Sequence, residues 1–303
     1  MKILVTGASG FVGAHLARAL LARGHAVRAV YLPADPTDRL NALAPDVERL
    51  PLDLAVASES MLEDAIRGMD ACVHAAWYAV PGRYLTAPEN LVCLSFSIRL
   101  LQAAARLRIQ RFVGIGSCAE YDTSVGDLDE QTPLRPTTLY AAAKASVFLL
   151  GEQMAAQTGM SFAWCRLFYL YGPFEPANRL VSDLFANLLA GKPCPVTSGR
   201  QVRDFLHISD AAAAVAAVVE SDLRGPVNIG SGEAAEVRQV VEMAAELTGR
   251  SDLIRWGARP ENLLDPPRIV AINSKLRQIG WSPVQSLKEG LRDTMAWWKE
   301  RIQ

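Results

Sequence analysis

Features that mark secreted, membrane-bound or nucleic-acid-binding proteins are scarce in this sequence of 303 residues. The formal net charge is −1, so the chain offers no strong attraction to nucleic acid or to an anionic membrane surface. No apolar run reaches the length of a membrane span, and we expect a core strand instead of a signal peptide at the start. The cysteines are odd in number and form no C-x-x-C pair: Cys72, Cys93, Cys118, Cys165 and Cys194. We therefore expect a reduced, cytoplasmic protein with no nucleic-acid partner, membrane partner or metal site.

What the sequence does contain is a glycine-rich turn at its beginning. An apolar run of strand length, residues 2–6, is followed by Gly7, Gly10 and Gly13, and a helical pattern then extends to Arg23. A strand, a glycine turn and a helix in this order are typical of a dinucleotide-binding unit, in which a pyrophosphate lies at the N-terminus of the helix. Gly7 would allow the sharp turn, Gly10 the approach of the phosphates, and Gly13 close packing of helix on sheet. The alternative is a glycine-rich turn with no ligand.

The end of the second predicted strand, residues 25–31, bears on the choice of cofactor. NAD-binding units usually place an acid there to bind the ribose hydroxyls, but this chain has Tyr31. Without that acid a 2′-phosphate is not repelled, and Arg39 or Arg28 could pair with it. The pattern predicts NADP(H), with NAD(H) as the alternative and with Arg39 then a solvated helix residue.

Predicted strands and helices alternate along the first half of the chain. A third strand ends at residues 52–54, and two further strands occupy residues 71–76 and 112–116. Helices fit residues 58–68, 88–108 and 139–156. This alternation predicts an α/β fold with a Rossmann-type, doubly wound parallel sheet. The small residues Ala75 and Ala76 at a strand end leave room for a cofactor to cross. The aromatic loop 77–84 that follows could line a substrate pocket or cover the edge of the sheet.

Ser117, Tyr140 and Lys144 form the candidate catalytic set. Tyr140 and Lys144 are four residues apart on a predicted helix and therefore share one face. A nearby ammonium group would favour the phenolate and lower the pKa of Tyr140 from about 10, which would make it a general acid or base. Ser117 follows the fifth strand and could hydrogen-bond a carbonyl or alkoxide beside Tyr140.

With these motifs in place, the sequence resembles the extended short-chain dehydrogenases/reductases of the nucleotide-sugar epimerase, dehydratase and reductase type. The resemblance covers nearly the whole chain and is carried by residues 6–13, Asp53-Leu54, residues 117–121, Tyr140-x-x-x-Lys144, residues 166–173 and residues 203–207. It implies hydride exchange between a nicotinamide and a sugar carbon, and a homodimer formed through helices 88–108 and 139–156. It also implies a dinucleotide-binding domain over residues 1–170, with return segments near 203–232. A smaller C-terminal substrate domain would occupy mainly residues 171–303.

The resemblance implies specific contacts with the cofactor. They are expected at Gly7, Ser9, Gly10, Phe11, Val12, Gly13, Tyr31, Arg39, Asp53, Leu54, Ala75, Ala76 and Lys144.

Departures from the family pattern narrow the predicted chemistry. The family's 4,6-dehydratases carry an acidic pair after the strand-end Ser or Thr, whereas this chain has Cys118 and Ala119 there, so elimination of water is not expected. Glu120 lies one position too far along. Cys118 could donate a proton to the substrate or could be a small buried residue beside the site.

The expected substrate contacts also depart from the pattern. Tyr169 stands where many relatives place an Asn against the substrate phosphates. Guanidinium groups suit a diphosphate and could compensate. The substrate-binding candidates are Tyr78, Cys118, Tyr169, Arg179, Arg203 and Arg259.

These observations favour an NAD(P)-dependent 4-ketoreductase acting on a nucleoside-diphosphate 4-keto-6-deoxyhexose. One alternative is a nucleotide-sugar 4-epimerase with tightly bound NAD. The other is a non-catalytic protein that senses dinucleotides on the same fold.

Overall fold

A seven-stranded parallel sheet forms the centre of the protein in the computed structural model, which describes residues 1–41, 43, 47–262 and 265–302. The strand order is β12-β7-β5-β4-β1-β2-β3. These strands are β1 (Lys2–Thr6), β2 (Ala26–Tyr31), β3 (Glu48–Pro51), β4 (Ala71–His74), β5 (Arg111–Ser117), β7 (Ser161–Leu167) and β12 (Gly225–Ile229). The prediction of a doubly wound parallel sheet is confirmed.

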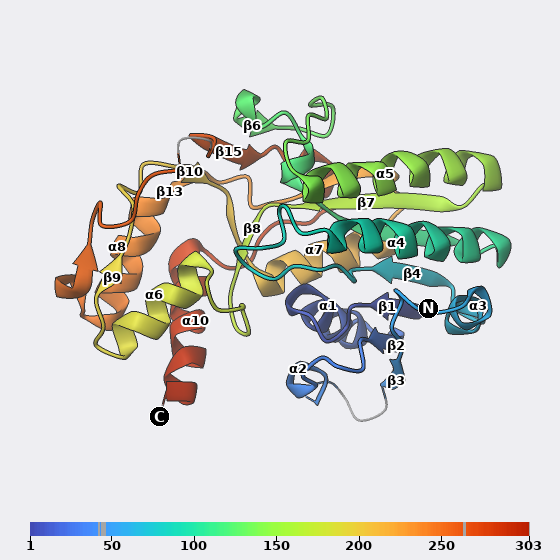
Figure 1. The fold of residues 1–303 in the computed structure, drawn as a ribbon, viewed down its shortest axis with the longest axis horizontal. Coiled ribbons are helices and arrows are strands. Elements are labelled where there is room, and N and C mark those ends of the chain that lie inside the picture. The colour runs from blue at the N-terminus through green and yellow to red at the C-terminus, as the bar shows by residue number, and fades with distance from the viewer. Residues whose placement is uncertain (42, 44–46, 263–264, 303) are drawn as a thin grey trace.

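Helices cover both faces of this sheet (Figure 1). The α-helices are α1 (Phe11–Ala22), α2 (Asp38–Asn41), α3 (Glu59–Ile66), α4 (Glu89–Arg106), α5 (Leu139–Thr158), α6 (Leu180–Leu189), α7 (Ile208–Glu220), α8 (Val237–Thr248), α9 (Ser274–Gln278) and α10 (Leu287–Ile302). One apolar core joins the sheet to α1, α7 and α9, and a second joins its other face to α3, α4 and α5. Burying each large aliphatic side chain there contributes roughly 1.5–3 kcal/mol, so the two cores hold the layers together.

The strand order reverses beside β1. The chain runs from β1 outward to β2 and β3, and then returns to β4 on the other side of β1. At such a reversal the loops that leave the carboxyl ends of the two strands diverge and open a crevice, which is where doubly wound sheets bind ligands. The turn after β1, the residues after β4 and the end of β5 therefore border one place.

The C-terminal part of the chain forms a lobe beside the carboxyl edge of the sheet, with α6, α8 and α10 packed together (Figure 1). Its short strands are β8 (Tyr169–Tyr171), β9 (Cys194–Pro195), β10 (Val202–Arg203), β11 (Phe205–His207), β13 (Ala235–Glu236), β14 (Ile254–Arg255) and β15 (Arg268–Ala271), and β6 (Asp127–Leu128) pairs with β15. Strand β12 returns to the main sheet between these segments. The predicted division near residue 170 stays a prediction. No helix in the described ranges is long and apolar enough to cross a membrane.

Two predicted boundaries differ from the structure. Strand β3 ends at Pro51 because Asp53 accepts a hydrogen bond from the backbone N–H of Ala55 and starts a turn. From the sequence, Ser209 is the expected N-cap of a helix that runs to Ser221, but helix α7 begins at Ile208 and its N-cap is His207, whose imidazole accepts a hydrogen bond from the N–H of Ser209. In both cases a local side-chain hydrogen bond fixed a boundary that the apolar pattern could not locate.

Candidate functional site

The turn between β1 and α1 leaves backbone N–H groups free for an anion. Gly7 has φ +69°, and a Cβ atom there would lie 2.7 Å from the Cα of Ala76. A Cβ on Gly13 would overlap the carbonyl oxygen of Gly7, so helix and turn approach each other only because both residues lack side chains. Gly10 is the N-cap of α1; no side chain caps the helix and no acid lies in its first turn. These features fit the phosphates of a dinucleotide, as do the positions of Ser9, Phe11 and Val12 around the same turn.

An acidic side chain reaches this turn from the loop after β2. The hydroxyl of Ser9 donates a hydrogen bond to Asp35 over 2.5 Å. Arg39, on α2, donates instead to the backbone oxygens of Ser9 and Phe174, over 3.1 Å in each case. The guanidinium group of Arg39 therefore ties the turn to the C-terminal lobe. The turn is thus bordered by one carboxylate, that of Asp35, and one guanidinium group, that of Arg39.

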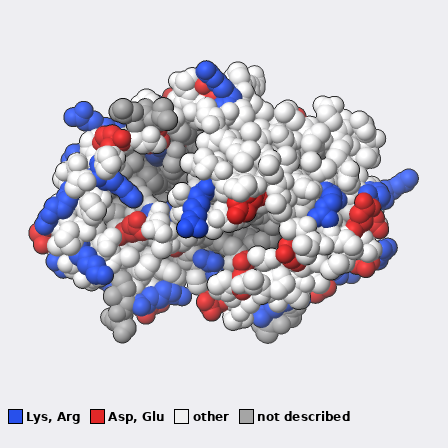
Figure 2. Space-filling model, viewed as in Figure 1, with Lys and Arg blue, Asp and Glu red and all other residues white. Residues whose placement is uncertain are grey.

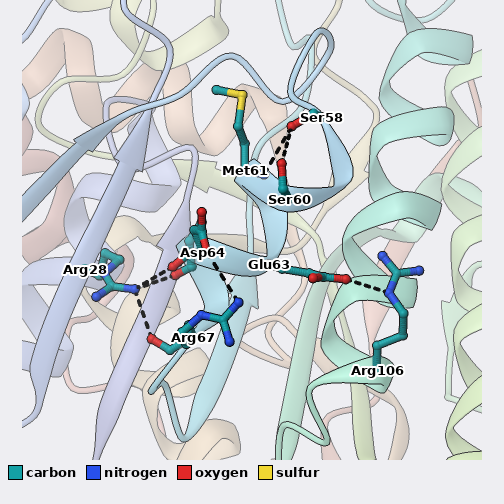
Figure 3. Close-up of polar contacts among 9 residues, drawn as sticks. Arg28, Ser58, Ser60, Met61, Glu63, Asp64, Arg67 and Arg106 are labelled. Atoms are coloured by element: carbon teal, nitrogen blue, oxygen red, sulfur yellow. Dashed lines mark hydrogen bonds and ion pairs between the residues drawn. The ribbon is translucent and has the colours of Figure 1, made fainter.

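Arg28 is also committed elsewhere. Its guanidinium pairs with Glu48 on β3 over 2.7 Å and donates to the carbonyl oxygen of Ala65 at the end of α3 over 2.7 Å. Figure 3 shows Arg28 directed toward this end of α3, close to the ion pair of Asp64 with Arg67. The suggestion that Arg28 could pair with a 2′-phosphate is wrong.

The remaining cofactor candidates lie at the carboxyl ends of neighbouring strands. Tyr31 ends β2 and packs against the core under α1. Leu54 is buried after β3, and its carbonyl oxygen accepts a hydrogen bond from Arg99 on α4. Ala75 and Ala76 follow β4, and the N–H of Ala76 donates to the hydroxyl of Thr6 over 3.3 Å.

The candidate catalytic residues meet at the end of β5. Thr138 caps α5 by accepting a hydrogen bond from the N–H of Ala141, which places Tyr140 in the first helical turn. A hydrogen bond links Tyr140 to the Ser117 side chain. Lys144, one turn further along, is buried and donates to the carbonyl oxygen of Ile115 over 2.5 Å. The structure therefore brings Ser117, Tyr140 and Lys144 together.

The pKa values of this set differ from the sequence prediction. Burial raises the pKa of Tyr140, with the neighbouring Tyr84 as a second cause, while the hydrogen bond with Ser117 acts in the opposite direction. Burial lowers the pKa of Lys144 to about 7. The expected lowering of the Tyr140 pKa is wrong for this structure, because desolvation of the buried phenol has the largest effect on it.

Comparison with known proteins gives the family. Residues 3–230 match the model of the NAD dependent epimerase/dehydratase family. The chain belongs to this family. Its members are NAD-dependent enzymes of the extended short-chain dehydrogenase/reductase type, so the resemblance found in the sequence is confirmed.

Individual relatives match along almost the full length of the chain. A UDP-glucose 4-epimerase of Corynebacterium glutamicum is 30% identical over 93% of this chain and 91% of its own length. A dTDP-glucose 4,6-dehydratase of Streptomyces niveus is 28% identical over 99% of this chain and 93% of its own. The solved structure of a Thermus thermophilus UDP-glucose 4-epimerase in complex with NAD is 26% identical, with a TM-score of 0.87 and coverage of 99% of both chains. Family membership thus includes both isomerases and dehydratases.

The aromatic loop after β4 packs on the candidate catalytic residues, whereas the sequence did not decide between a place beside the site and a cover for the sheet edge. The ring of Tyr84 meets that of Tyr140 edge to face with 4.9 Å between centroids, and Trp77 does so with 6.2 Å. The Trp77 ring also lies 3.9 Å from Lys144 Nζ. Tyr78 instead packs into the core beside α4, where its N–H donates to the sulfur of Cys93. The signal for Trp77 and Tyr84 was their position after a strand end, but sequence alone did not separate them from Tyr78.

The arginines among the substrate-binding candidates fall into two groups: two lie over aromatic rings, and one is exposed. Arg203 is buried, forms a 2.7 Å ion pair with Asp265 and lies over the Tyr169 ring. Arg179 lies over the ring of Tyr84, 5.2 Å from its centroid, and so borders the catalytic set. Arg259 is exposed, and only its backbone N–H, which donates to Val196, has a hydrogen bond described for it.

Neither Cys118 nor Glu120 can replace the missing acidic pair. Cys118 is buried beside Tyr121 and Phe168, and burial raises the pKa of its thiol to about 12. Glu120 is fully buried and forms a 2.9 Å ion pair with Arg166. The carboxylate of Glu120 is engaged in the interior of the fold, which agrees with its displaced position in the motif.

Proposed function

We propose that this protein is an NAD-dependent nucleotide-sugar 4-epimerase. The observation that carries the proposal is the cluster of Ser117, Tyr140 and Lys144 beside the glycine turn, with Cys118 and Ala119 where dehydratases have acids. The sequence favoured a 4-ketoreductase because Cys118 and Ala119 replace the elimination acids, and also because Tyr31, in place of an acid at the end of β2, removes an anchor for the cofactor. Asp35 on Ser9 weakens the second reason, and a UDP-glucose 4-epimerase is among the relatives with 30% identity.

In the proposed reaction a hydride leaves C4 of the sugar and a proton leaves the 4-hydroxyl group, and both later return. NAD, when bound, accepts that hydride and gives it back. As the hydride leaves, the Tyr140 phenolate takes the proton of the 4-hydroxyl, and the phenol so formed returns this proton after the keto sugar has presented its other face. Ser117 hydrogen-bonds the C4 oxygen, and the ammonium group of Lys144 stabilises the Tyr140 phenolate. No reduced cofactor is consumed in the cycle.

The C-terminal lobe is proposed to hold the nucleotide diphosphate. Guanidinium groups bind phosphate oxygens with two donors at once, which makes Arg179 and Arg203 the strongest candidates. Tyr169, beside Arg203, would contact the same part of the substrate, and Arg259 and Tyr78 are the weaker members of the predicted set. In this proposal residues 171–303 mainly serve substrate binding, as the family resemblance implied.

An assay with no added cofactor tests the proposed activity. Purified protein incubated with UDP-glucose or another nucleotide hexose should interconvert the C4 epimers, and NAD should be released on denaturation. A contrary result would be stoichiometric oxidation of added NADPH by a nucleoside-diphosphate 4-keto-6-deoxyhexose with no epimer formed. That result would restore the ketoreductase.

Cofactor choice gives a second prediction. We expect NAD to bind at least about tenfold more tightly than NADP, because the Asp35 carboxylate would repel a 2′-phosphate, and tenfold in affinity corresponds to ~1.4 kcal/mol. Titration of the cofactor-free protein with both dinucleotides measures this ratio. Asp35→Asn should narrow it, whereas Asp38→Asn, which removes an exposed charge on α2 nearby, should not. Tighter binding of NADP by the unmodified protein would contradict the assignment.

The predicted homodimer remains a proposal. Leu91 and Val92 on α4 are 55% and 47% exposed, and Leu149 on α5 is 52% exposed. Figure 2 shows that the surface over α4 and α5 carries few charged side chains. An apolar face on the two helices that the family resemblance named supports a contact between two copies there.

A further inference from the structure

The ammonium group of Lys144 lies against aromatic rings. Its Nζ atom is 3.9 Å from the centroid of the Trp77 ring, 5.8 Å from that of Trp164 and 6.0 Å from that of Tyr140. None of the described carboxylates forms an ion pair with it, and its one hydrogen bond goes to the carbonyl oxygen of Ile115. A cation over the face of an indole is stabilised by the ring quadrupole, most strongly where water is excluded.

The indole N–H group of Trp77 holds the ring in this position. It donates a 2.9 Å hydrogen bond to Asn90 on α4. Asn90 is fully buried, and its amide donates in turn to the carbonyl oxygens of Tyr84 and Ala87. This network fixes the plane of the indole, so that its face meets Lys144 and its ring packs edge to face with Tyr140.

We propose that Trp77 is a positioning residue for the reaction: its indole face keeps Lys144 in the ammonium form beside Tyr140. The inference rests on the proposed function for its catalytic consequence, but the contact itself can be measured without turnover. Trp77 touches no reacting atom in this account. It acts through the charge of Lys144, on which the phenolate of Tyr140 depends.

The other charged and titratable groups around Lys144 do not replace this contact. Glu120, from the segment after β5, favours the charged lysine but is paired with Arg166. Cys93 on α4 is a buried thiol whose pKa is raised, and His74 on β4 is neutral because burial lowers its pKa to about 3. Burial has lowered the pKa of Lys144 to about 7, so the loss of one favourable contact would change its charge at neutral pH.

The pH dependence of the free energy of unfolding reports the charge of Lys144. The pKa of lysine is about 7 in the folded protein and near 10.4 when unfolded. Between these values the unfolded state binds the extra proton, so Lys144 makes the free energy of unfolding rise with pH from about 7 upward. Subtracting the curve of Lys144→Met from that of the parent protein isolates this contribution from all other groups.

The experiment repeats that subtraction with two further proteins: the curve of the double variant Trp77→Leu, Lys144→Met is subtracted from that of Trp77→Leu. Removal of the indole should move the start of the rise down by roughly one pH unit, as expected for a desolvated cation–π contact. Trp77→Phe keeps a ring face and should give a smaller displacement, and it serves if Trp77→Leu fails to fold. An unchanged starting pH in both variants would overturn the proposal.

Trp256 provides a matched control. Its ring lies 3.9 Å from the guanidinium carbon of Arg238, the same separation as in the Lys144 contact, but it is 36% exposed on the C-terminal lobe. Trp256→Leu removes a tryptophan and a cation–π contact and should leave the Lys144 contribution where it is. If the starting pH of the rise moved as far in Trp256→Leu as in Trp77→Leu, the change would reflect a general loss of stability and not the contact with Lys144.

Activity supplies a separate readout. For Trp77→Leu, turnover at pH 7 should fall about fivefold, the change in protonated fraction that follows when a pKa near 7 drops by one unit. The acid side of the pH profile should recover more of the activity, with little change in KM. If the starting pH of the Lys144 contribution to stability changes as expected but no protein, parent or variant, shows epimerase turnover, the proposed function is wrong and the role of the Trp77 contact is retained.

Discussion

Tyr140→Phe is expected to lower epimerase turnover by about 10²- to 10⁴-fold, the usual contribution of a general acid or base. The substitution removes only the hydroxyl group, so the ring contacts with Tyr84 and Trp77 and the position of Lys144 are retained. NAD affinity should stay close to that of the parent protein because the glycine turn is untouched. Steady-state assays and titration with NAD measure the two quantities separately.

Tyr84→Phe is the matched control for this experiment. It removes a hydroxyl from the ring that packs against Tyr140, and it also relieves one cause of the raised Tyr140 pKa. We expect a change of turnover far smaller than that of Tyr140→Phe. Near-normal turnover in Tyr140→Phe, or equal losses in the two variants, would remove Tyr140 from the proposed proton transfer.

The parts of the site that sequence predicted correctly depend on short-range patterns. The glycine turn is fixed by Gly7, Gly10 and Gly13 within a few residues, and Tyr140 and Lys144 share a helix face because a helix repeats every 3.6 residues. For the same reason the sequence pattern of residues 237–248 predicts a helix with the limits that α8 has. Alternating strands and helices leave few parallel topologies, which made the sheet predictable.

Features that depend on long-range packing were not predictable in the same way. The 2.5 Å contact of Asp35 with Ser9 depends on the path of a loop, so the sequence could not include it when it predicted the cofactor from Tyr31 and Arg39. Burial is the main cause of the raised pKa of Tyr140, and the second cause is the neighbouring Tyr84, whose loop had two open interpretations. Helical spacing placed Lys144 near Tyr140 but gave no information on the indole beside it. In each case the deciding neighbour comes from a different element of the chain.

Arg166 illustrates the same limit and carries the second large effect. Its guanidinium group, 1% exposed, pairs with the fully buried Glu120 over 2.9 Å. Glu120 also accepts hydrogen bonds from the indole N–H of Trp164 and from the backbone N–H of Ser117. The sequence showed Arg166 and Glu120 in separate motifs, and the fold joins them beside Ser117.

Arg166→Met should lower the free energy of unfolding by about 3–5 kcal/mol, because removing one partner leaves an uncompensated buried charge. Urea denaturation measures this loss. Arg67→Met is the control, since Arg67 pairs with Asp64 at an exposed site and should cost under about 1 kcal/mol. Glu120→Gln combined with Arg166→Met should cost less than Arg166→Met alone, since no buried carboxylate then lacks its cation.

The loss in Arg166→Met should also depend on pH. Burial raises the pKa of Glu120, and Arg166 is the largest influence that opposes this rise. Without Arg166 the pKa of Glu120 rises further, so the folded variant keeps a proton on Glu120 that the unfolded chain loses near pH 4.3. A group whose pKa is raised by folding loses stability as the pH increases toward its folded value. The destabilisation should therefore be smaller near pH 5 than near pH 8, and the Glu120→Gln background should abolish this difference. A loss that is equal at both pH values would mean that the cost arises from packing around Arg166, with no contribution from an unpaired carboxylate.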